Sequence, residues 1–155
     1  MRIQTFRWLG ALIRFGLGGL LLWTSIPKMT APAEFLSSIY GYELLGPQLA
    51  SVLAVVLPWT EFLTGMCLLG GVYLPGALLA CMALFTIFTL AQASVLHRGL
   101  SIDCGCGLPG DEHVTYSTLV RSLLLLIAAL VAYLCLSARR ESAADTSSAP
   151  AQTLA

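Results

Sequence analysis

The chain has 155 residues, of which 57% are hydrophobic and only 10% are charged, and its formal net charge is zero. A soluble globular protein carries about a quarter charged residues, so this composition predicts an integral membrane protein. A net charge of zero offers no basic face for nucleic acid. The length is sufficient for one compact bundle and not for a second folded domain.

Four apolar segments are long enough to cross a bilayer as helices, which takes about twenty residues. In chain order they are residues 8–26, 46–71, 75–96 and 117–136. Only residues 72–74 separate the second from the third, followed by Pro75 and Gly76, which predicts a tight hairpin. We therefore expect an all-α membrane protein, a four-transmembrane-helix bundle formed by residues 1–140.

The positive charges predict the orientation of this bundle. Two arginines precede the first apolar segment and two follow the fourth, namely Arg2, Arg7, Arg139 and Arg140. Excess Lys and Arg mark the cytoplasmic side. Both termini are therefore expected in the cytoplasm, and the connections 27–45 and 97–116 are expected outside it.

Three shorter segments carry expectations of their own. Residues 32–45 space Phe35, Ile39, Tyr42 and Leu45 as on one face of a short amphipathic helix at the membrane surface. The tail, residues 141–155, has little apolar surface and is expected to be disordered. The N-terminal segment imitates a cleavable secretory signal ending at residues 31–33, but Arg14 interrupts its apolar core, so we expect a retained span.

Two charged residues fall inside the predicted spans. Arg14 lies in the first and Glu61 in the second, and a charge at such depth costs at least about 2.5 kcal/mol unless it has a partner. Their depths differ by only about 6 Å, which favours an Arg14–Glu61 ion pair. The alternative is that Glu61 relays protons beside a kink at Pro58. A polar stripe on the third span is expected to pack helices, and comprises Thr86, Thr89 and Gln92.

The chemistry that the sequence offers is concentrated in residues 103–107, which read Asp-Cys-Gly-Cys-Gly. Cys104 and Cys106 are separated only by Gly105, so a disulfide between them would close a very tight ring. Strained, exposed disulfides are the readily reduced ones that serve catalysis. The other three cysteines lie within apolar runs and are expected to be inert, namely Cys67, Cys81 and Cys135.

The surroundings of the two thiols favour thiolates. His97, Arg98, His113 and the positive end of the fourth helix stabilise the anion, whereas Asp103 opposes it. A metal site would recruit His97 or His113, but metal-binding cysteine pairs usually have at least two residues between them, so we expect no metal site. A chance pair of cysteines in a glycine-rich turn is the remaining alternative.

Several of these residues together resemble the MauE (methylamine utilisation) proteins, within the wider DoxX-like group of four-helix membrane proteins. The resemblance covers most of the chain from Arg14 to about Ala132. It is carried by Arg14, Lys28, residues 58–61 (Pro-Trp-Thr-Glu), residues 98–100 (Arg-Gly-Leu) and residues 103–107.

Membership would imply a protein of the bacterial inner membrane that assists maturation of the disulfide-rich small subunit of methylamine dehydrogenase. Other members serve thiol-handling pathways beside thioredoxin-like partners. This chain has Gly107-Leu108 where the family often reads Phe-Gly, and Ser122 follows Arg121 where Asn is frequent. Neither departure removes a thiol.

The leading hypothesis is therefore a thiol–disulfide oxidoreductase whose Cys104 or Cys106 forms a mixed disulfide with an extracytoplasmic thioredoxin-like protein or client. Arg98 would steady the thiolate. Glu61 and the Pro58 kink would shape a cavity for protons or, by analogy with other membrane oxidoreductases, for a quinone. The alternatives are a transporter that passes mercury or copper from the loop to a cysteine in the bundle, and a non-catalytic scaffold subunit.

Overall fold

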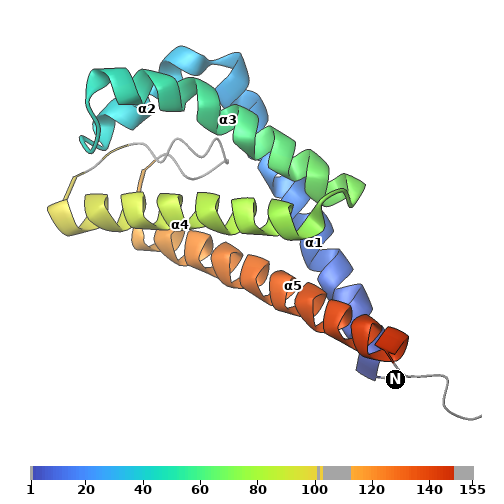
Figure 1. Ribbon diagram of the computed structural model, residues 1–155. Helices are drawn as coiled ribbons and strands as arrows, with labels where there is room; N and C mark the ends of the chain where they lie inside the picture. Colours follow the sequence, from blue (N-terminus) through green and yellow to red (C-terminus); the bar gives the residue numbers. More distant parts are fainter. Residues whose placement is uncertain (1, 101, 103–112, 149–155) are drawn as a thin grey trace, which may run out of the picture.

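The computed structural model describes residues 2–100, 102 and 113–148, and these residues form five helices (Figure 1). The helices are α1 (Arg2–Thr30), α2 (Pro32–Gly41), α3 (Pro47–Gly70), α4 (Leu74–Arg98) and α5 (Tyr116–Ser148). All except α2 are long and apolar enough to cross a membrane. The predicted class, an all-α bundle of four membrane-spanning helices, is confirmed.

The short helix predicted after the first span is also present, as α2. Pro32 begins it, which suits a residue that has no N–H to donate within the first turn. Phe35 is its buried residue, whereas Tyr40 on another face is exposed. The helix is thus confirmed with Phe35 on its buried face, but it ends at Gly41, so Tyr42 and Leu45 of the predicted face lie beyond it and Leu45 is exposed.

Two helices run further than predicted. α1 continues past Ile26 to Thr30, because the carbonyl of Pro27 accepts the N–H of Ala31 at 2.9 Å and keeps the backbone helical. The expectation that the chain leaves the helix at Pro27 is wrong, and Lys28 belongs to α1. α5 continues to Ser148, although residues 142–148 consist of Ser, Ala, Asp and Thr, of which only Ala strongly favours a helix. Residues 141–148, expected to be disordered, are helical.

The hairpin between α3 and α4 has the predicted tight form. Gly71 ends α3 with φ of +72°, and its N–H bonds to the carbonyl of Cys67. Tyr73 also has positive φ, at +49°, and Pro75 lies in the first turn of α4. A left-handed residue after a helix is usually glycine, since a Cβ is strained there. From this hairpin α3 and α4 diverge, while α5 runs beside α4 (Figure 1).

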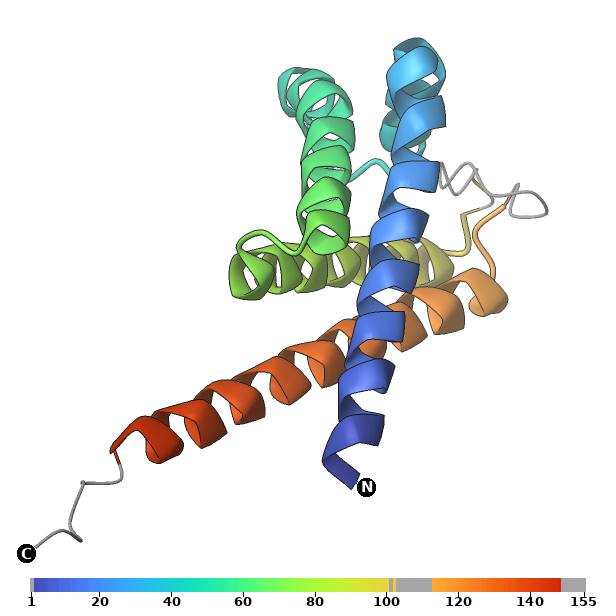
Figure 2. The same ribbon diagram turned by 90° about the vertical axis from the view of Figure 1, so that its right-hand side faces the viewer.

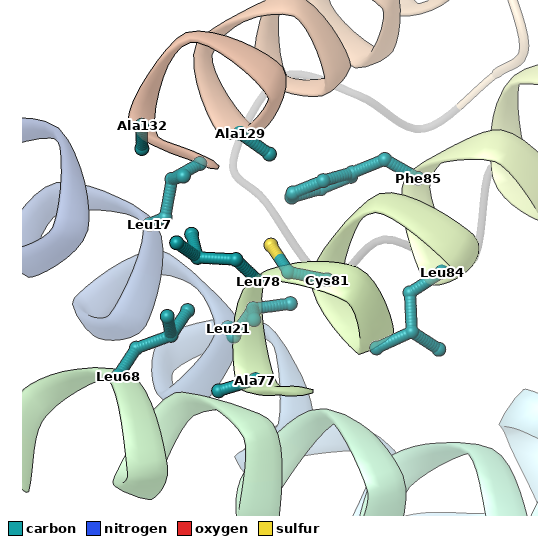
Figure 3. Close-up of a cluster of buried hydrophobic side chains, with 10 residues drawn as sticks. All are labelled: Leu17, Leu21, Leu68, Ala77, Leu78, Cys81, Leu84, Phe85, Ala129 and Ala132. Atoms are coloured by element: carbon teal, nitrogen blue, oxygen red, sulfur yellow. The ribbon is translucent and has the colours of Figure 1, made fainter. Parts of the chain in front are cut away.

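The apolar core lies where α1, α3, α4 and α5 meet (Figure 3). Figure 2 shows α1 crossing α5, and α1 also packs against α3, which brings its middle into this junction. Cys81 of α4 is fully buried there and lies among leucines, as expected of an inert cysteine. The buried members are Leu17, Leu21, Leu68, Ala77, Leu78, Cys81, Leu84, Phe85, Ala129 and Ala132.

Two glycines allow α1 and α3 to approach closely. A Cβ placed on Gly65 would lie 3.0 Å from the carbonyl oxygen of Gly18, and one placed on Gly18 would lie 3.1 Å from the carbonyl oxygen of Gly65. Small residues at a crossing let two backbones pack directly. The close approach of α1 and α3 is thus made by this pair, since a Cβ on Gly16 or Gly19 meets nothing within 4 Å.

We expect Gly65→Ala to destabilise the bundle by about 1–3 kcal/mol, because a methyl group there must push two backbones apart. Gly19→Ala is the matched control, since the same methyl on α1 meets no neighbour and improves helix propensity by up to about 1 kcal/mol. Unfolding in mixed micelles, followed by circular dichroism, measures both. Equal stability of the two variants would contradict the close crossing.

Candidate functional site

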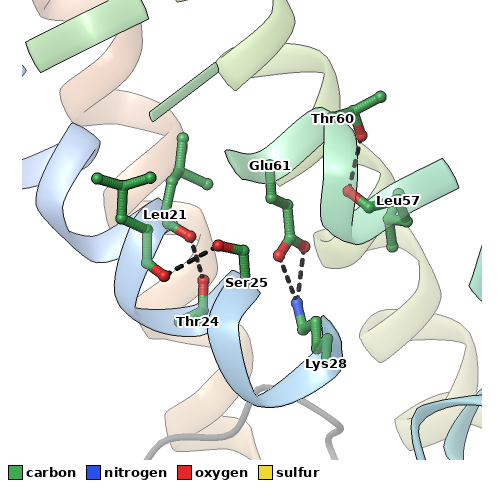
Figure 4. A network of polar contacts seen from close by, with 8 residues as sticks. Leu21, Thr24, Ser25, Lys28, Leu57, Thr60 and Glu61 are labelled. Carbon is green, nitrogen blue, oxygen red and sulfur yellow. Dashed lines mark hydrogen bonds and ion pairs between the residues drawn. The ribbon is translucent and has the colours of Figure 1, made fainter. Parts of the chain in front are cut away.

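Glu61 of α3 and Lys28 of α1 form a buried ion pair (Figure 4). The Nζ atom of Lys28 donates to Oε1 of Glu61 at 2.6 Å and to Oε2 at 2.9 Å. The Glu61 side chain is fully buried and that of Lys28 is 6% exposed. Because both carboxylate oxygens bond to one ammonium group, each charge has its partner inside the apolar bundle.

Two aromatic rings complete the surroundings of the ammonium group. Nζ of Lys28 lies 5.2 Å from the ring centroid of Phe35 and 5.0 Å from that of Phe88. A cation within about 6 Å of a ring centroid is attracted by the electrons of the ring face. The ion pair and its two rings therefore join α1, α2, α3 and α4 at one point.

The predicted Arg14–Glu61 pair is wrong. Arg14 lies at the opposite end of α3, where its Nη1 atom would be 3.3 Å from a Cβ placed on Gly71. Its Cζ lies 4.6 Å from the ring centroid of Phe15, and its Nε is buried without a hydrogen-bond partner. The prediction failed because the first span was expected to end at residue 26. Lys28 was therefore assigned to a loop and was not considered as a partner for the Glu61 carboxylate.

The hydroxyl groups around the ion pair are occupied by their own helices. Thr24 and Ser25 of α1 donate to the carbonyls of Leu21 and Leu22. Thr60 of α3 donates to the carbonyl of Leu57 (Figure 4). The carboxylate of Glu61 is thus held by the lysine, and its predicted role as a site residue stays a prediction.

A second polar contact joins α4 to α5. Oγ of Ser122 lies 2.6 Å from Oε1 of Gln92, and both side chains are buried. The same hydroxyl also lies 2.8 Å from the carbonyl oxygen of Thr118. Thr86 and Thr89 bond to carbonyls of their own helix. Of the predicted polar stripe, Gln92 is therefore the member that packs helices together.

The segment that carries Cys104 and Cys106 lies between Ile102 and Val114, and its two ends join the bundle at a small apolar cluster. The N–H of Val114 donates to the carbonyl of Ile102 at 2.9 Å, which brings the two ends of the segment together. Val95 and Val114 are buried in this cluster, with Tyr42, Leu96, Leu100 and Ile102 packed against them. We call it the outer-end cluster, because the sequence predicts that this end of the bundle faces outside the cytoplasm. Cys104 and Cys106, the predicted reactive residues, lie outside the described residues, as does Asp103.

Arg98, predicted as a site residue, holds the neighbouring α2–α3 connection. Its Nη1 donates to the carbonyl of Tyr42 at 2.9 Å, and its Nη2 lies 2.7 Å from Oε2 of Glu43. Glu43 has a positive φ of +50°, a conformation that these contacts help to maintain. Burial raises the pKa of the Tyr42 phenol to about 12, so this group stays neutral at physiological pH.

An apolar cavity of about 590 Å³ lies between these features and is lined by residues of all five helices. Its polar and charged lining residues include Lys28, Gln92, Arg121 and Ser122, and Phe35 also lines it. Its size falls within the usual range for small-molecule sites. The sequence predicted that Glu61 and Pro58 would shape a cavity. They do not line this one, and Lys28 and Leu57 take that place.

A metal site is not evident in the part of the chain that the structure describes, since no three His, Cys, Asp or Glu residues there could hold an ion together. His97 and His113 are both exposed. The described cysteines, Cys67, Cys81 and Cys135, are free thiols.

Comparison with known proteins places this chain, with its four candidate membrane-spanning helices, in a family. The family model described as methylamine utilisation protein MauE matches residues 6–135. The chain belongs to the MauE family. It is 39% identical, over 87 residues, to the methylamine utilization protein MauE of Methylophilus methylotrophus, an alignment that covers 53% of this chain and 44% of that protein. The alignment thus spans less than half the length of this relative. No solved structure matches the chain.

Proposed function

We propose that this MauE-family protein is a membrane thiol–disulfide redox protein whose Cys104 and Cys106 exchange electrons with an extracytoplasmic protein. A thiolate of one protein attacks the disulfide of the other, a mixed disulfide forms, and a second thiolate releases it. In methylamine utilisation, the process that gives the family its name, the client would be the disulfide-rich small subunit of methylamine dehydrogenase, reached directly or through a thioredoxin-like partner.

The observation that carries this proposal is the attachment of the cysteine-bearing segment. The Ile102–Val114 hydrogen bond and the outer-end cluster tie both ends of that segment to the same end of the bundle. Two closely spaced thiols on a short, anchored segment suit repeated exchange with a docking protein. The positive-inside pattern puts this end outside the cytoplasm, where disulfides persist.

Arg98 acts in this proposal as a positioning residue. Its contacts with Tyr42 and Glu43 join the end of α4 to the α2–α3 connection, and Tyr42 packs in the outer-end cluster. The guanidinium is committed to these acceptors, so its first effect is to fix the base of the cysteine segment. Stabilisation of the thiolate by its charge would be secondary.

Trapping of a mixed disulfide tests the proposal. Cys106→Ser and Cys104→Ser are compared in cells that produce the methylamine dehydrogenase small subunit, with proteins separated without reductant. We expect one of the two variants to accumulate a reducible adduct with an extracytoplasmic protein. If neither does, and mercury or copper instead protects the thiols from alkylation, the chain is a metal carrier. The absence of both results would favour a scaffold subunit.

A further inference from the structure

We propose that the guanidinium group of Arg14 binds the phosphate of an anionic phospholipid in a small pocket between α1, α4 and α5. The pocket is lined by Arg14 and Ala11 of α1, by Leu74 of α4 and by Ala132 of α5, among others. Leu74 begins α4, whereas the outer-end cluster lies at the other end of that helix. The site is therefore remote from the proposed disulfide exchange and does not depend on it.

Arg14 is a cation for which the described residues supply no counter-charge. Its Nε is buried without a hydrogen-bond partner, and its Nη atoms form no hydrogen bond or ion pair with a residue that the structure describes. Its Cζ lies 4.6 Å from the ring centroid of Phe15, a contact that adds no negative charge. A guanidinium group has five N–H donors and stays charged. Inside a membrane span such a group needs a partner, so we look for an anion outside the described chain.

The acidic residues whose backbone the structure describes lie away from Arg14. Two of the described acidic side chains form ion pairs with other basic residues and the third is exposed on α2, namely Glu43, Glu61 and Glu34. Glu141 and Asp145 follow Cys135, which lines the pocket, by six and ten residues. Figure 2 shows that α5 runs away from α1 beyond their crossing, which carries these two positions away from Arg14.

Arg14 lies close to the level of the lipid headgroups. It follows Gly10, where the first candidate span begins, by four residues, or about 6 Å. Trp8 and Tyr73 are 67% and 85% exposed at the same end of the bundle, and such aromatic side chains are typical of the membrane–water interface. An arginine near the end of a span extends its charge towards that interface. A phospholipid phosphate is therefore within its reach.

The pocket has room for a phosphate group but not for a whole lipid. Its volume is about 110 Å³, and a water-sized occupant needs about 10–15 Å³, so the four oxygens of a phosphate fit. Gly71 keeps this space open, because a Cβ there would lie 3.3 Å from Nη1 of Arg14. Leu74, in the lining, begins α4, and the N-cap residue Tyr73 makes no side-chain hydrogen bond to that helix. The positive end of α4 thus adds to the charge of the arginine.

The charges at this end favour an anionic lipid as the source of the phosphate. The first acidic residue of the chain is Glu34, and the basic residues that flank the predicted spans here are Arg2, Arg7, Arg139 and Arg140. Basic pockets between membrane helices on the cytoplasmic side, where the charge pattern puts this end, bind anionic headgroups. Leu12 and Leu134, next to the lining residues Ala11 and Cys135, are 69% and 55% exposed. They offer contacts to acyl chains that free phosphate could not use.

Native mass spectrometry of the full chain tests the site without a substitution. The protein is purified in detergent and titrated with phosphatidylglycerol or with phosphatidylcholine of the same acyl chains. We expect one tightly bound phosphatidylglycerol, with an affinity about fivefold or more above that for phosphatidylcholine. Equal affinity for the two lipids would overturn the proposal. Displacement of phosphatidylglycerol by equimolar inorganic phosphate would overturn it in favour of a free anion.

A matched pair of arginine variants locates the binding. Arg14→Gln removes the group that would bind the phosphate, whereas Arg140→Gln removes the same charge from the part of α5 beyond the pocket. We expect Arg14→Gln to weaken phosphatidylglycerol binding by about tenfold or more. At physiological salt, which screens distant charges, Arg140→Gln should change it by less than about twofold. Equal effects of the two substitutions would overturn the assignment to Arg14.

A second pair of variants tests the pocket while every charge is retained. Ala11 lines the pocket, whereas Ala83 is exposed on α4 outside it. We expect Ala11→Leu, which fills the pocket, to weaken phosphatidylglycerol binding by about tenfold, and Ala83→Leu to leave it within about twofold. Circular dichroism checks the helix content of each variant. Binding to Ala11→Leu as tight as to the native chain would overturn the site.

Discussion

Glu61→Gln is expected to destabilise the bundle by about 3 kcal/mol or more, because it leaves the Lys28 ammonium buried without a counter-charge. Both oxygens of the carboxylate now bond to that group, and neither side chain has appreciable access to solvent. An amide can offer one oxygen but no charge. The loss is measured as the free energy of unfolding in mixed micelles.

Two further variants make this result specific. Glu34→Gln is the matched control, since it removes the same charge from an exposed position on α2 and is expected to change stability by less than about 0.5 kcal/mol. Lys28→Met combined with Glu61→Leu removes both charges and should recover most of the stability lost in Glu61→Gln. A Glu61→Gln variant as stable as Glu34→Gln would contradict the buried pair.

Replacement of both Cys104 and Cys106 by serine is expected to abolish disulfide formation in the client while leaving the bundle folded. Serine cannot form a disulfide, so no electrons can pass through the segment. Both residues lie between the spans, after the one that ends at Arg98 and before the one that begins at Tyr116. The measurement is the fraction of oxidised methylamine dehydrogenase small subunit in cells that depend on this chain.

Cys135→Ser supplies the control for that experiment. Cys135 is a partly buried free thiol of α5 that lies beside α1, where a Cβ on Gly10 would be 3.8 Å from its Cβ. Its replacement should leave client oxidation unchanged. If the double serine variant oxidised the client as well as Cys135→Ser does, the segment would have no role in exchange.

The spans and the hairpin could be predicted because hydrocarbon imposes them. A run of about twenty apolar residues must form a helix in lipid, and the short break before Pro75 leaves no room for anything but a tight turn. The ends of the helices could not be read in the same way. Hydropathy falls at Pro27, whereas the backbone hydrogen bond from Ala31 carries α1 on to Thr30.

The partner of Glu61 depends on that helix end and on the crossing of α1 over α3. The sequence identified a buried acid that needs a cation, which is correct, but chose Arg14 by depth alone. Helices that cross at Gly18 and Gly65 bring together residues on either side of the crossing, and Lys28, not Arg14, lies on the side of Glu61. A basic residue only two positions after the predicted end of a span was the available signal.

The sequence analysis predicted a cavity, but it named the wrong lining residues. Pro58 and Glu61 suggested a hollow in α3, whereas the cavity is lined by residues of all five helices, and α3 contributes Leu53 and Leu57 to it. Such a space depends on angles between helices, and these follow from packing at the α1–α3 crossing. No local pattern in the chain encodes them.

Labelling of Cys104 and Cys106 in intact cells tests most directly the claim that a redox-active thiol pair faces the exterior. In a chain whose other cysteines are serine, a membrane-impermeant maleimide is added before and after mild reduction. The account predicts little labelling before reduction, because the pair is oxidised, and labelling of both residues afterwards without permeabilisation. Labelling that requires permeabilised cells would contradict it.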